Sequence, residues 1–208
     1  MKKLTLIILS SLFFTSISLP QVGYGSEVSG DLFIPIGKNA SNFNIGFGGL
    51  AGFYYDITEN FRMGLVLGYL YSSINESNVN NDFASSGQQA DVKGGVGIIP
   101  ALISVRLVSP EPGMRFYGLL EGGLYTYSTS ISGSYPGGAP IDQSEFRSEP
   151  GIAVGGGLLL PLKNDISLDI SVRYHWVQDS EYINYEGTEL ANSQAITIGV
   201  GANWFFPL

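Results

Sequence analysis

Apolar and polar residues alternate along much of the chain. In "ISLDISVRYHW" (166–176), Ile, Leu, Ile, Val, Tyr and Trp occupy every second position, and Ser, Asp, Arg and His lie between them. Side chains switch face at each residue of a strand, so the pattern predicts a β-strand with one apolar and one polar face. The segments "FRMGLVLGYLY" (61–71) and "QAITIGVGANWFF" (194–206) repeat it.

Eight segments of this kind can be marked. Several reach or exceed the ~9–11 residues that a tilted strand needs to cross a bilayer, whereas strands of ordinary globular proteins average about 5–6 residues. The predicted strands cover residues 27–36, 44–55, 61–72, 92–107, 114–129, 147–160, 166–177 and 194–206.

The connections between these segments alternate in length. The tight connections are 56–60, 109–113 and 162–165. The connections that alternate with them are polar: three are long (73–91, 130–146 and 178–193) and one is shorter (37–43). Transmembrane barrels alternate short periplasmic turns with longer extracellular loops. The parity therefore predicts a barrel with both termini on the periplasmic side.

The N-terminus has the features of a secretory signal. Lys2 and Lys3 precede the apolar stretch "LTLIILSSLFFTSISLP" (4–20), and Gly23 and Gly25 are small residues suited to a cleavage site. We expect a signal peptide over residues 1–25 and an outer-membrane β-barrel domain over 26–208. The alternative is an uncleaved membrane anchor, for which the apolar stretch is short.

Composition further limits the secondary structure, the partners and the chemistry that the chain can have. With 28 glycines, 12 phenylalanines, 12 tyrosines and 13% charged residues, the chain favours strands and tight turns over long helices. Its net charge of −8 becomes −10 once both leading lysines are removed, and no basic cluster remains, so nucleic acid is not an expected partner. Because cysteine is absent, disulfides, cysteine-bound metals and thiol nucleophiles are excluded.

Two closed barrels fit the alternation: a soluble lipocalin-like barrel with its apolar face inside, and a membrane barrel with that face toward lipid. The polar face is rich in Gly, Ser and Thr with single charges of both signs, which suits the crowded interior of an eight-stranded barrel. We therefore predict an all-β, eight-stranded, antiparallel, up-and-down transmembrane β-barrel. We expect Asp169 and Arg173 to find partners among Arg62, Arg115 and Glu121, because buried charges must pair. The interior charge network is predicted to comprise Glu27, Asp31, Arg62, Arg106, Arg115, Glu121, Asp169 and Arg173, with His175 also inside.

Aromatic residues lie near the ends of the apolar faces, where membrane barrels carry interfacial girdles. The predicted girdle residues are Phe61, Tyr69, Tyr71, Tyr174, Trp176, Trp204 and Phe206.

Candidate chemistry is sparse. His175 is the only histidine and shares a strand face with Asp169 and Ser171. Ser171 and His175 are four residues apart on a strand, which places them roughly 13 Å from one another at ~3.3 Å per residue, too far for proton transfer. We expect no catalytic, metal or cofactor site. The long connections are acidic, with Glu76, Asp82, Asp91, Asp142, Glu145, Glu149, Asp179, Glu181, Glu186 and Glu189 against the single Arg147.

With these features, the chain resembles the small outer-membrane β-barrel proteins of Gram-negative bacteria, the OmpA/OmpX-like or "porin family" group. The similarity covers the mature chain and is carried by "GDLFIPIG" (30–37), "YYDITENFRMGLVLGYLY" (54–71), "MRFYGLLEGGLY" (114–125), "GGGLLLPLKNDISLDISVRYHW" (155–176) and "ANWFF" (202–206). It implies insertion by the barrel-assembly machinery, which reads a final aromatic residue. Here Pro207 and Leu208 follow Phe206, a departure from that pattern.

The expected function is that of a monomeric integral outer-membrane protein with a structural or surface-interaction role. We predict a plugged polar lumen, acidic extracellular loops, outer-membrane lipid as its surroundings and an unknown partner at the loops. Two alternatives remain: a porin-like channel for small solutes and a soluble, lipocalin-like ligand-binding barrel.

Overall fold

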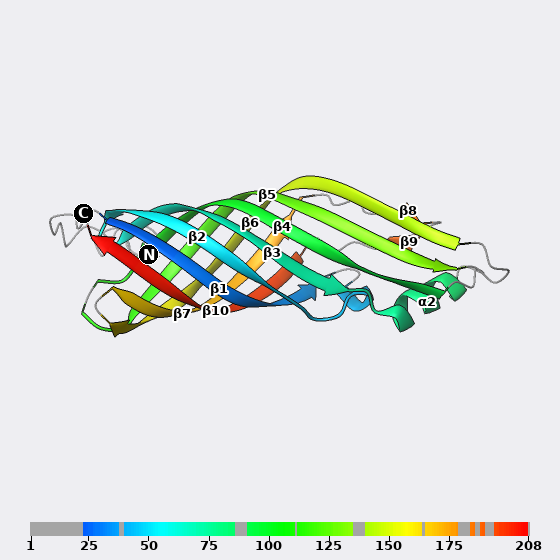
Figure 1. Ribbon diagram of the computed structural model, residues 1–208, viewed down its shortest axis with the longest axis horizontal. Coiled ribbons are helices and arrows are strands. Elements are labelled where there is room, and N and C mark those ends of the chain that lie inside the picture. Colours follow the sequence, from blue (N-terminus) through cyan, green and yellow to red (C-terminus); the bar gives the residue numbers. More distant parts are fainter. Residues whose placement is uncertain are drawn as a thin grey trace, which may run out of the picture.

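The computed structural model describes residues 23–37, 40–85, 91–110, 112–134, 140–163, 165–178, 184–185, 188–189 and 194–207. Within these ranges, eight antiparallel strands close a barrel in the order β1-β10-β7-β6-β5-β4-β3-β2 (Figure 1). Each strand pairs with its neighbours in sequence, and β10 closes the sheet against β1. The strands are β1 (Gly23–Ile36), β2 (Gly46–Thr58), β3 (Phe61–Ser73), β4 (Asp91–Val108), β5 (Arg115–Ser134), β6 (Pro140–Lys163), β7 (Ile166–Val177) and β10 (Gln194–Pro207). The predicted fold class is confirmed.

The two ends of the barrel differ. Both ends of the described chain lie together at one end, with the tight β2–β3, β4–β5 and β6–β7 connections (Figure 1); we call this the turn end and the opposite one the loop end. At the turn end, the Asn60 side-chain amide donates to the carbonyl of Val108 over 2.8 Å, which ties one turn to β4. Gly113 has a φ of 95°, a conformation that only glycine adopts readily, so it permits the β4–β5 turn.

The connection predicted over residues 130–146 is corrected by the structure. Most of it is strand: β5 and β6 pair without interruption from Arg115 opposite Leu159 to Ser134 opposite Pro140. The alternation continues through this polar stretch, since Thr129 and Ile131 are buried whereas Ser128 and Ser130 are exposed. The serines and threonines resemble a loop in composition but keep the two-residue period of a strand. The result is a hairpin that extends beyond the barrel at the loop end (Figure 1).

Short elements occupy the other loop-end connections. They are η1 (Ala40–Asn42), α2 (Glu76–Ser85), β8 (Asn184–Tyr185) and β9 (Thr188–Glu189). The helix α2 packs against the barrel through Val79, which is fully buried, and through the Asn80 side chain, which accepts from the backbone N–H of Val92 over 3.0 Å. In the described ranges, no helix has the length and apolar character needed to cross a membrane.

The first strand begins earlier than predicted. Gly23 and Gly25 pair with β10 and with β2 as part of β1, although the sequence places both in the signal peptide. Residues 1–22 lie outside the described residues, so the signal peptide and its cleavage position stay predictions.

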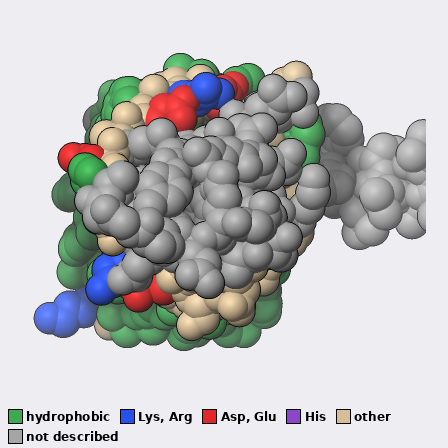
Figure 2. Space-filling view, turned by 90° about the vertical axis from the view of Figure 1, so that its right-hand side faces the viewer, with side chains coloured by type: hydrophobic (Ala, Val, Ile, Leu, Met, Phe, Trp, Pro, Cys, Tyr) green, Lys and Arg blue, Asp and Glu red, His purple; other side chains and the backbone are tan. Residues whose placement is uncertain are grey.

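The outer face of the barrel is apolar and its interior holds the charges. Exposed hydrophobic side chains come from all eight strands, and hydrophobic atoms border the molecule when it is viewed from the loop end (Figure 2). The exposed members near the middle of strands include Val28, Leu65, Leu67, Ile103, Leu120, Val172 and Val200. This arrangement is the reverse of a lipocalin-like barrel and contradicts the soluble alternative. An apolar outer surface is stable in contact with lipid. The closed barrel also leaves no backbone edge unpaired there.

The face assignment predicts a position-dependent effect of charge. Leu67 is the central residue of β3 and 59% of its surface is exposed, so Leu67→Arg should lower the free energy of unfolding by about 2–4 kcal/mol in a lipid bilayer. Phe146, which is 68% exposed on the hairpin extension, is the matched control, and Phe146→Arg should leave stability within about 0.5 kcal/mol. Urea titration in lipid vesicles measures both. Equal stability of the two variants would show that β3 does not face lipid.

Candidate functional site

The barrel interior is built in layers that follow the inward residues of β7. From the turn end, Ser167, Asp169, Ser171, Arg173, His175 and Val177 point inward in turn, and all but Ser167 are buried. Ser167 lines an open cavity, the mouth, at the turn end. Asp169 and Arg173 belong to a charge cluster that we define as Glu27, Asp31, Arg106, Glu121, Asp169 and Arg173. Val177 belongs to an apolar layer at the loop end.

Arg106 is the first organising cation of the charge cluster. Its Nη1 donates to Glu27 Oε2 over 2.5 Å and lies 3.6 Å from Asp169 Oδ2, and its Nη2 donates to the Tyr54 hydroxyl. The guanidinium carbon lies 4.2 Å from the Tyr54 ring centroid and 4.9 Å from that of Tyr117. Such cation–π contacts strengthen when water is excluded, and Arg106 is almost completely buried.

Arg173 is the second cation and faces three carboxylates. Its Nη2 donates to Glu27 Oε1 over 3.2 Å, its Nε lies 3.5 Å from Glu121 Oε2, and its Nη1 lies 3.8 Å from Asp31 Oδ1. Glu27 therefore bridges the two arginines, one through each carboxylate oxygen. This bridge connects β1, β4 and β7 across the interior.

Hydroxyl groups donate to one oxygen of each remaining acid, and the second oxygen of each faces an arginine without a hydrogen bond. Ser29 donates to Asp31 over 2.7 Å, Ser104 to Glu121 over 3.0 Å, and Tyr117 to Asp169 over 2.7 Å. All these groups are buried, and buried polar atoms require such partners to remain stable. The tyrosines at 54 and 117 were not singled out as network members by the sequence, although Tyr117 lies in phase with Arg115 and Glu121 on the polar face.

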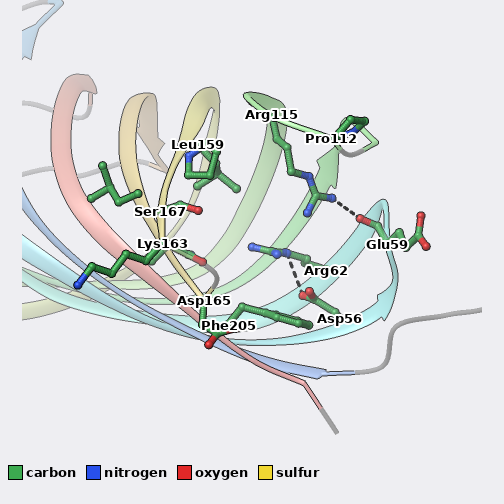
Figure 3. Close-up of a pocket in the computed structure, with 14 residues that line it drawn as sticks. Asp56, Glu59, Arg62, Pro112, Arg115, Leu159, Lys163, Asp165, Ser167 and Phe205 are labelled. Carbon is green, nitrogen blue, oxygen red and sulfur yellow. Dashed lines mark hydrogen bonds and ion pairs between the residues drawn. The ribbon is translucent and has the colours of Figure 1, made fainter.

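The structure places Arg62 and Arg115 outside this cluster. Arg62 Nε lies 2.9 Å from Asp56 Oδ1, and Arg115 donates to the backbone carbonyls of Ser109 and Glu59 over 2.9 and 2.5 Å. Both arginines line the mouth at the turn end (Figure 3). The expected pairing of Asp169 and Arg173 with Arg62 and Arg115 is therefore not what the structure shows; of the three expected partners, only Glu121 meets Arg173.

His175 is held by two hydroxyl groups. Its Nδ1 lies 2.9 Å from the Tyr125 hydroxyl and its Nε2 lies 3.0 Å from Thr197 Oγ1, and the Tyr125 ring packs edge-on against the imidazole at 5.8 Å. Ser171 Oγ instead accepts from Arg173 Nη1 over 2.8 Å. Ser171 and His175 therefore have separate partners among the described residues and do not form a Ser–His pair. Within the described ranges, no group of three or more His, Asp and Glu side chains could hold a metal ion.

The interior at the loop end is apolar, which corrects the expectation of a polar lumen throughout. Buried hydrophobic side chains from several strands pack there, and Val79 of α2 joins them. A small cavity of ≈ 10 Å³ lies beside His175, Tyr125 and members of this layer. Members of the layer include Phe33, Leu70, Val79, Ile98, Tyr127, Ile131, Val177 and Ala195.

The predicted girdle residues all lie on the outer face. Tyr69, Tyr71, Tyr174 and Trp176 are exposed near the loop-end termini of β3 and β7, whereas Phe206 is exposed and Phe61 and Trp204 are half-buried toward the turn end. The sequence missed the cluster around Tyr24, whose ring stacks on Phe53 at 5.7 Å and tilts against Tyr55 at 5.5 Å. Tyr24 was missed because it falls in the predicted signal peptide.

Removing Arg173 should destabilise the barrel strongly. Arg173→Met leaves Glu121 and Asp31 without their cation and Glu27 with one instead of two, and breaking a buried ion pair in this way costs about 3–5 kcal/mol. Arg147→Met is the matched control, because Arg147 is exposed and pairs with Glu145 at the surface; its cost should be below about 1 kcal/mol. Urea unfolding in vesicles compares the two. Adding Glu121→Gln to Arg173→Met should recover part of the loss, and an absence of any recovery would count against the ion-pair explanation.

Comparisons with known proteins bear on the fold. No protein-family model and no curated protein matches the chain. A major outer membrane protein from Thermus thermophilus superposes with a TM-score of 0.56 at 12% identity, over 88% of this chain and 99% of that chain. The outer membrane protein OprG from Pseudomonas aeruginosa superposes with a TM-score of 0.52 at 9% identity, over 91% of this chain and 98% of that chain. The predicted location in the outer membrane agrees with this fold and with the apolar outer surface. The chain thus has the fold of the small eight-stranded outer-membrane β-barrel proteins.

Proposed function

We propose that the protein is a closed, non-enzymatic outer-membrane barrel that presents an open strand edge at the cell surface for binding an extended segment of another polypeptide. The observation that carries this proposal is the pairing of the β6 segment Pro140–Glu149, which among the described strands is on one side only. The other supports are the chemistry of that edge and the filled interior of the barrel.

Among the described residues, the outer part of β6 pairs on one side only. It pairs with β5 from Pro140 onward, and its pairing with β7 begins at Gly151. The backbone N–H of Gln178 donates to the carbonyl of Pro150 over 2.9 Å, the outermost contact between these segments in the described ranges. Between Pro140 and Glu149, no described strand pairs with the second side of β6. Unpaired backbone groups of this kind bind extended peptides by strand addition, which is a common recognition mode.

The side chains of this edge suit a soluble surface with one apolar contact. Asp142 and Ser144 are exposed, and Glu145 pairs with Arg147. Charges along an edge discourage uncontrolled association with other sheets. Phe146 is the exception, since it is exposed among polar neighbours and offers an aromatic anchor to a partner.

The interior favours a barrel that does not conduct. Eight strands enclose a space just wide enough for side chains to fill. The charge cluster, the His175 layer and the apolar layer follow one another along β7, and a small cavity of ≈ 10 Å³ lies beside the last two. A solute would have to displace both the Glu27 bridge and the apolar layer to pass.

The orientation follows from the two ends. Short turns face the periplasm and longer connections face outward in barrels of this type. The turn end, with the termini, is then periplasmic, and the β5–β6 extension projects into the extracellular space.

The edge can be tested with two neighbouring proline substitutions, Ser144→Pro and Glu145→Pro. Backbone N–H groups point to alternate sides along a strand, so one of the two prolines removes an edge donor and the other removes a bond to β5. Against peptides selected from a random displayed library on the barrel in nanodiscs, the edge-facing proline should weaken binding at least tenfold and leave the fold intact. Ser144→Ala, which keeps the N–H, is the control. Peptides that bind both proline variants as well as the parent would refute strand addition.

The closed interior predicts the result of planar-bilayer recording. The folded protein should produce no stepwise conductance at ±100 mV in 1 M salt, because the buried side chains of the charge cluster and of the apolar layer would obstruct an aqueous path. The same preparation should migrate as a compact band before heating, which verifies that the recorded protein is folded. Reproducible steps from folded protein would instead establish the channel alternative.

A further inference from the structure

The first residues of β1 are built into the wall of the barrel. Gly23, Tyr24 and Gly25 pair with β10 on one side and with β2 on the other, at the seam where the last strand closes the sheet on the first. Their partners are Pro207, Phe206 and Phe205 on β10 and Asp56, Tyr55 and Tyr54 on β2. Cleavage of the chain after Gly25 would remove all three residues from this seam.

Side-chain contacts would be lost with these residues. The Tyr24 ring stacks on Phe53 and tilts against Tyr55. Gly23 lies so close to the Phe205 ring that a Cβ at Gly23 would be only 2.6 Å from it. On the backbone, β2 and β10 would each keep a stretch of N–H and C=O groups without their β1 partners. Such groups are costly where lipid replaces water.

The position of Glu27 makes this loss more serious. Its carboxylate bridges Arg106 and Arg173, and the residue is 2% exposed. In the strand as it stands, the paired residues 23–26 precede Glu27, whereas after a cut behind Gly25 only Ser26 would precede it. Terminal residues are poorly ordered unless they are tied down. That cut would therefore place the central ion pairs of the barrel one residue from a fraying end.

The sequence upstream of the barrel contains a second site of the required kind. Signal peptidases select small residues at the last and third-last positions of the leader. Within residues 1–22, Ser16 and Ser18 are the only two residues among Gly, Ala, Ser and Thr that have one residue between them. A leader that ends at Ser18 has Lys2 and Lys3 followed by the largely apolar stretch 4–14, which fits the length of about 7–15 residues usual for this region.

We propose that a signal peptidase hydrolyses the peptide bond between Ser18 and Leu19, so that the mature chain begins at Leu19 and keeps β1 complete. Water adds across the amide: Ser18 leaves with the new carboxylate, and Leu19 keeps the new amine. Residues 19–22 then separate this amine from the first paired residue of β1, and Glu27 stays inside a continuous strand. The proposal concerns processing at the turn end and does not depend on the proposed role of the β6 edge.

The cleavage site can be read directly from the protein made in a Gram-negative host as the full chain 1–208. N-terminal sequencing and intact mass of the protein from purified outer membranes should give a chain that starts at Leu19. Ser18→Phe, which puts a bulky residue at the last position of the leader, should abolish this product and leave the precursor. Gly25→Phe is the matched control, because it would block a cut after Gly25 but should still yield a chain that starts at Leu19.

Mass distinguishes precursor from product whether or not a variant barrel folds, so a folding defect in Gly25→Phe does not obscure the result. The proposal is overturned if the mature chain starts at Ser26 or at any residue other than Leu19. It is also overturned if the protein in the outer membrane retains its leader, or if Ser18→Phe is processed like the parent.

The structural reason for the assignment has its own test. Chains 19–208, 23–208 and 26–208, refolded from urea into lipid vesicles, differ only at the N-terminus. The first two should have the same urea midpoint, because both keep β1 whole, whereas 26–208 should have a clearly lower midpoint or give no compact band before heating. Equal midpoints for 26–208 and 19–208 would show that Gly23–Gly25 are dispensable and would remove the structural argument against a cut after Gly25.

Discussion

The bridge of Glu27 between Arg106 and Arg173 is the interaction on which the rest of the barrel depends. It joins β1, β4 and β7 through one carboxylate at the centre of the molecule. A barrel of eight strands has a narrow interior that side chains can fill. Charges placed there are costly unless each has a partner. Glu27 supplies one oxygen to each cation, and the hydroxyls of Ser29, Ser104 and Tyr117 each donate to one oxygen of the remaining carboxylates. These contacts join side chains of strands that are distant in sequence.

Small residues make this packing possible. Gly199 on β10 lies where any side chain would collide with the Asp31 carboxylate and the Ser171 hydroxyl, so glycine at this position allows the close approach of the cluster to the wall. On the outside, the same strands carry branched and aromatic side chains that only lipid can cover. The alternation of small polar and large apolar residues thus serves two constraints at once: a crowded interior and an apolar exterior.

The strands, their faces and the inward direction of the charges follow from the sequence because the two-residue period survives in every barrel strand. The partners of those charges do not follow, because they depend on the stagger of strands that are distant in sequence. Arg62 and Arg173 look equivalent in the alternation, yet one lies in the mouth and the other in the charge cluster. The β5–β6 extension was hidden by its serine-rich composition, and Tyr24 by its position beside the signal region. The apolar layer at the loop end was missed because the lumen was expected to be polar throughout, whereas inward residues such as Phe33 and Val177 are apolar.

The charge cluster and the apolar layer both lie between the two ends of the barrel. A shift in strand register would change which inward side chains meet in the interior. Such a shift is opposed by the Glu27 bridge, which would lose its geometry with a displacement of one residue on β1, β4 or β7. The β5–β6 extension continues the barrel's register without a break from Arg115 to Ser134, so the outer part of β6 is held in the sheet along one side. In the proposed role, an edge ordered in this way would avoid part of the ordering cost of association, and the stability of the charged centre would then contribute indirectly to recognition at the surface.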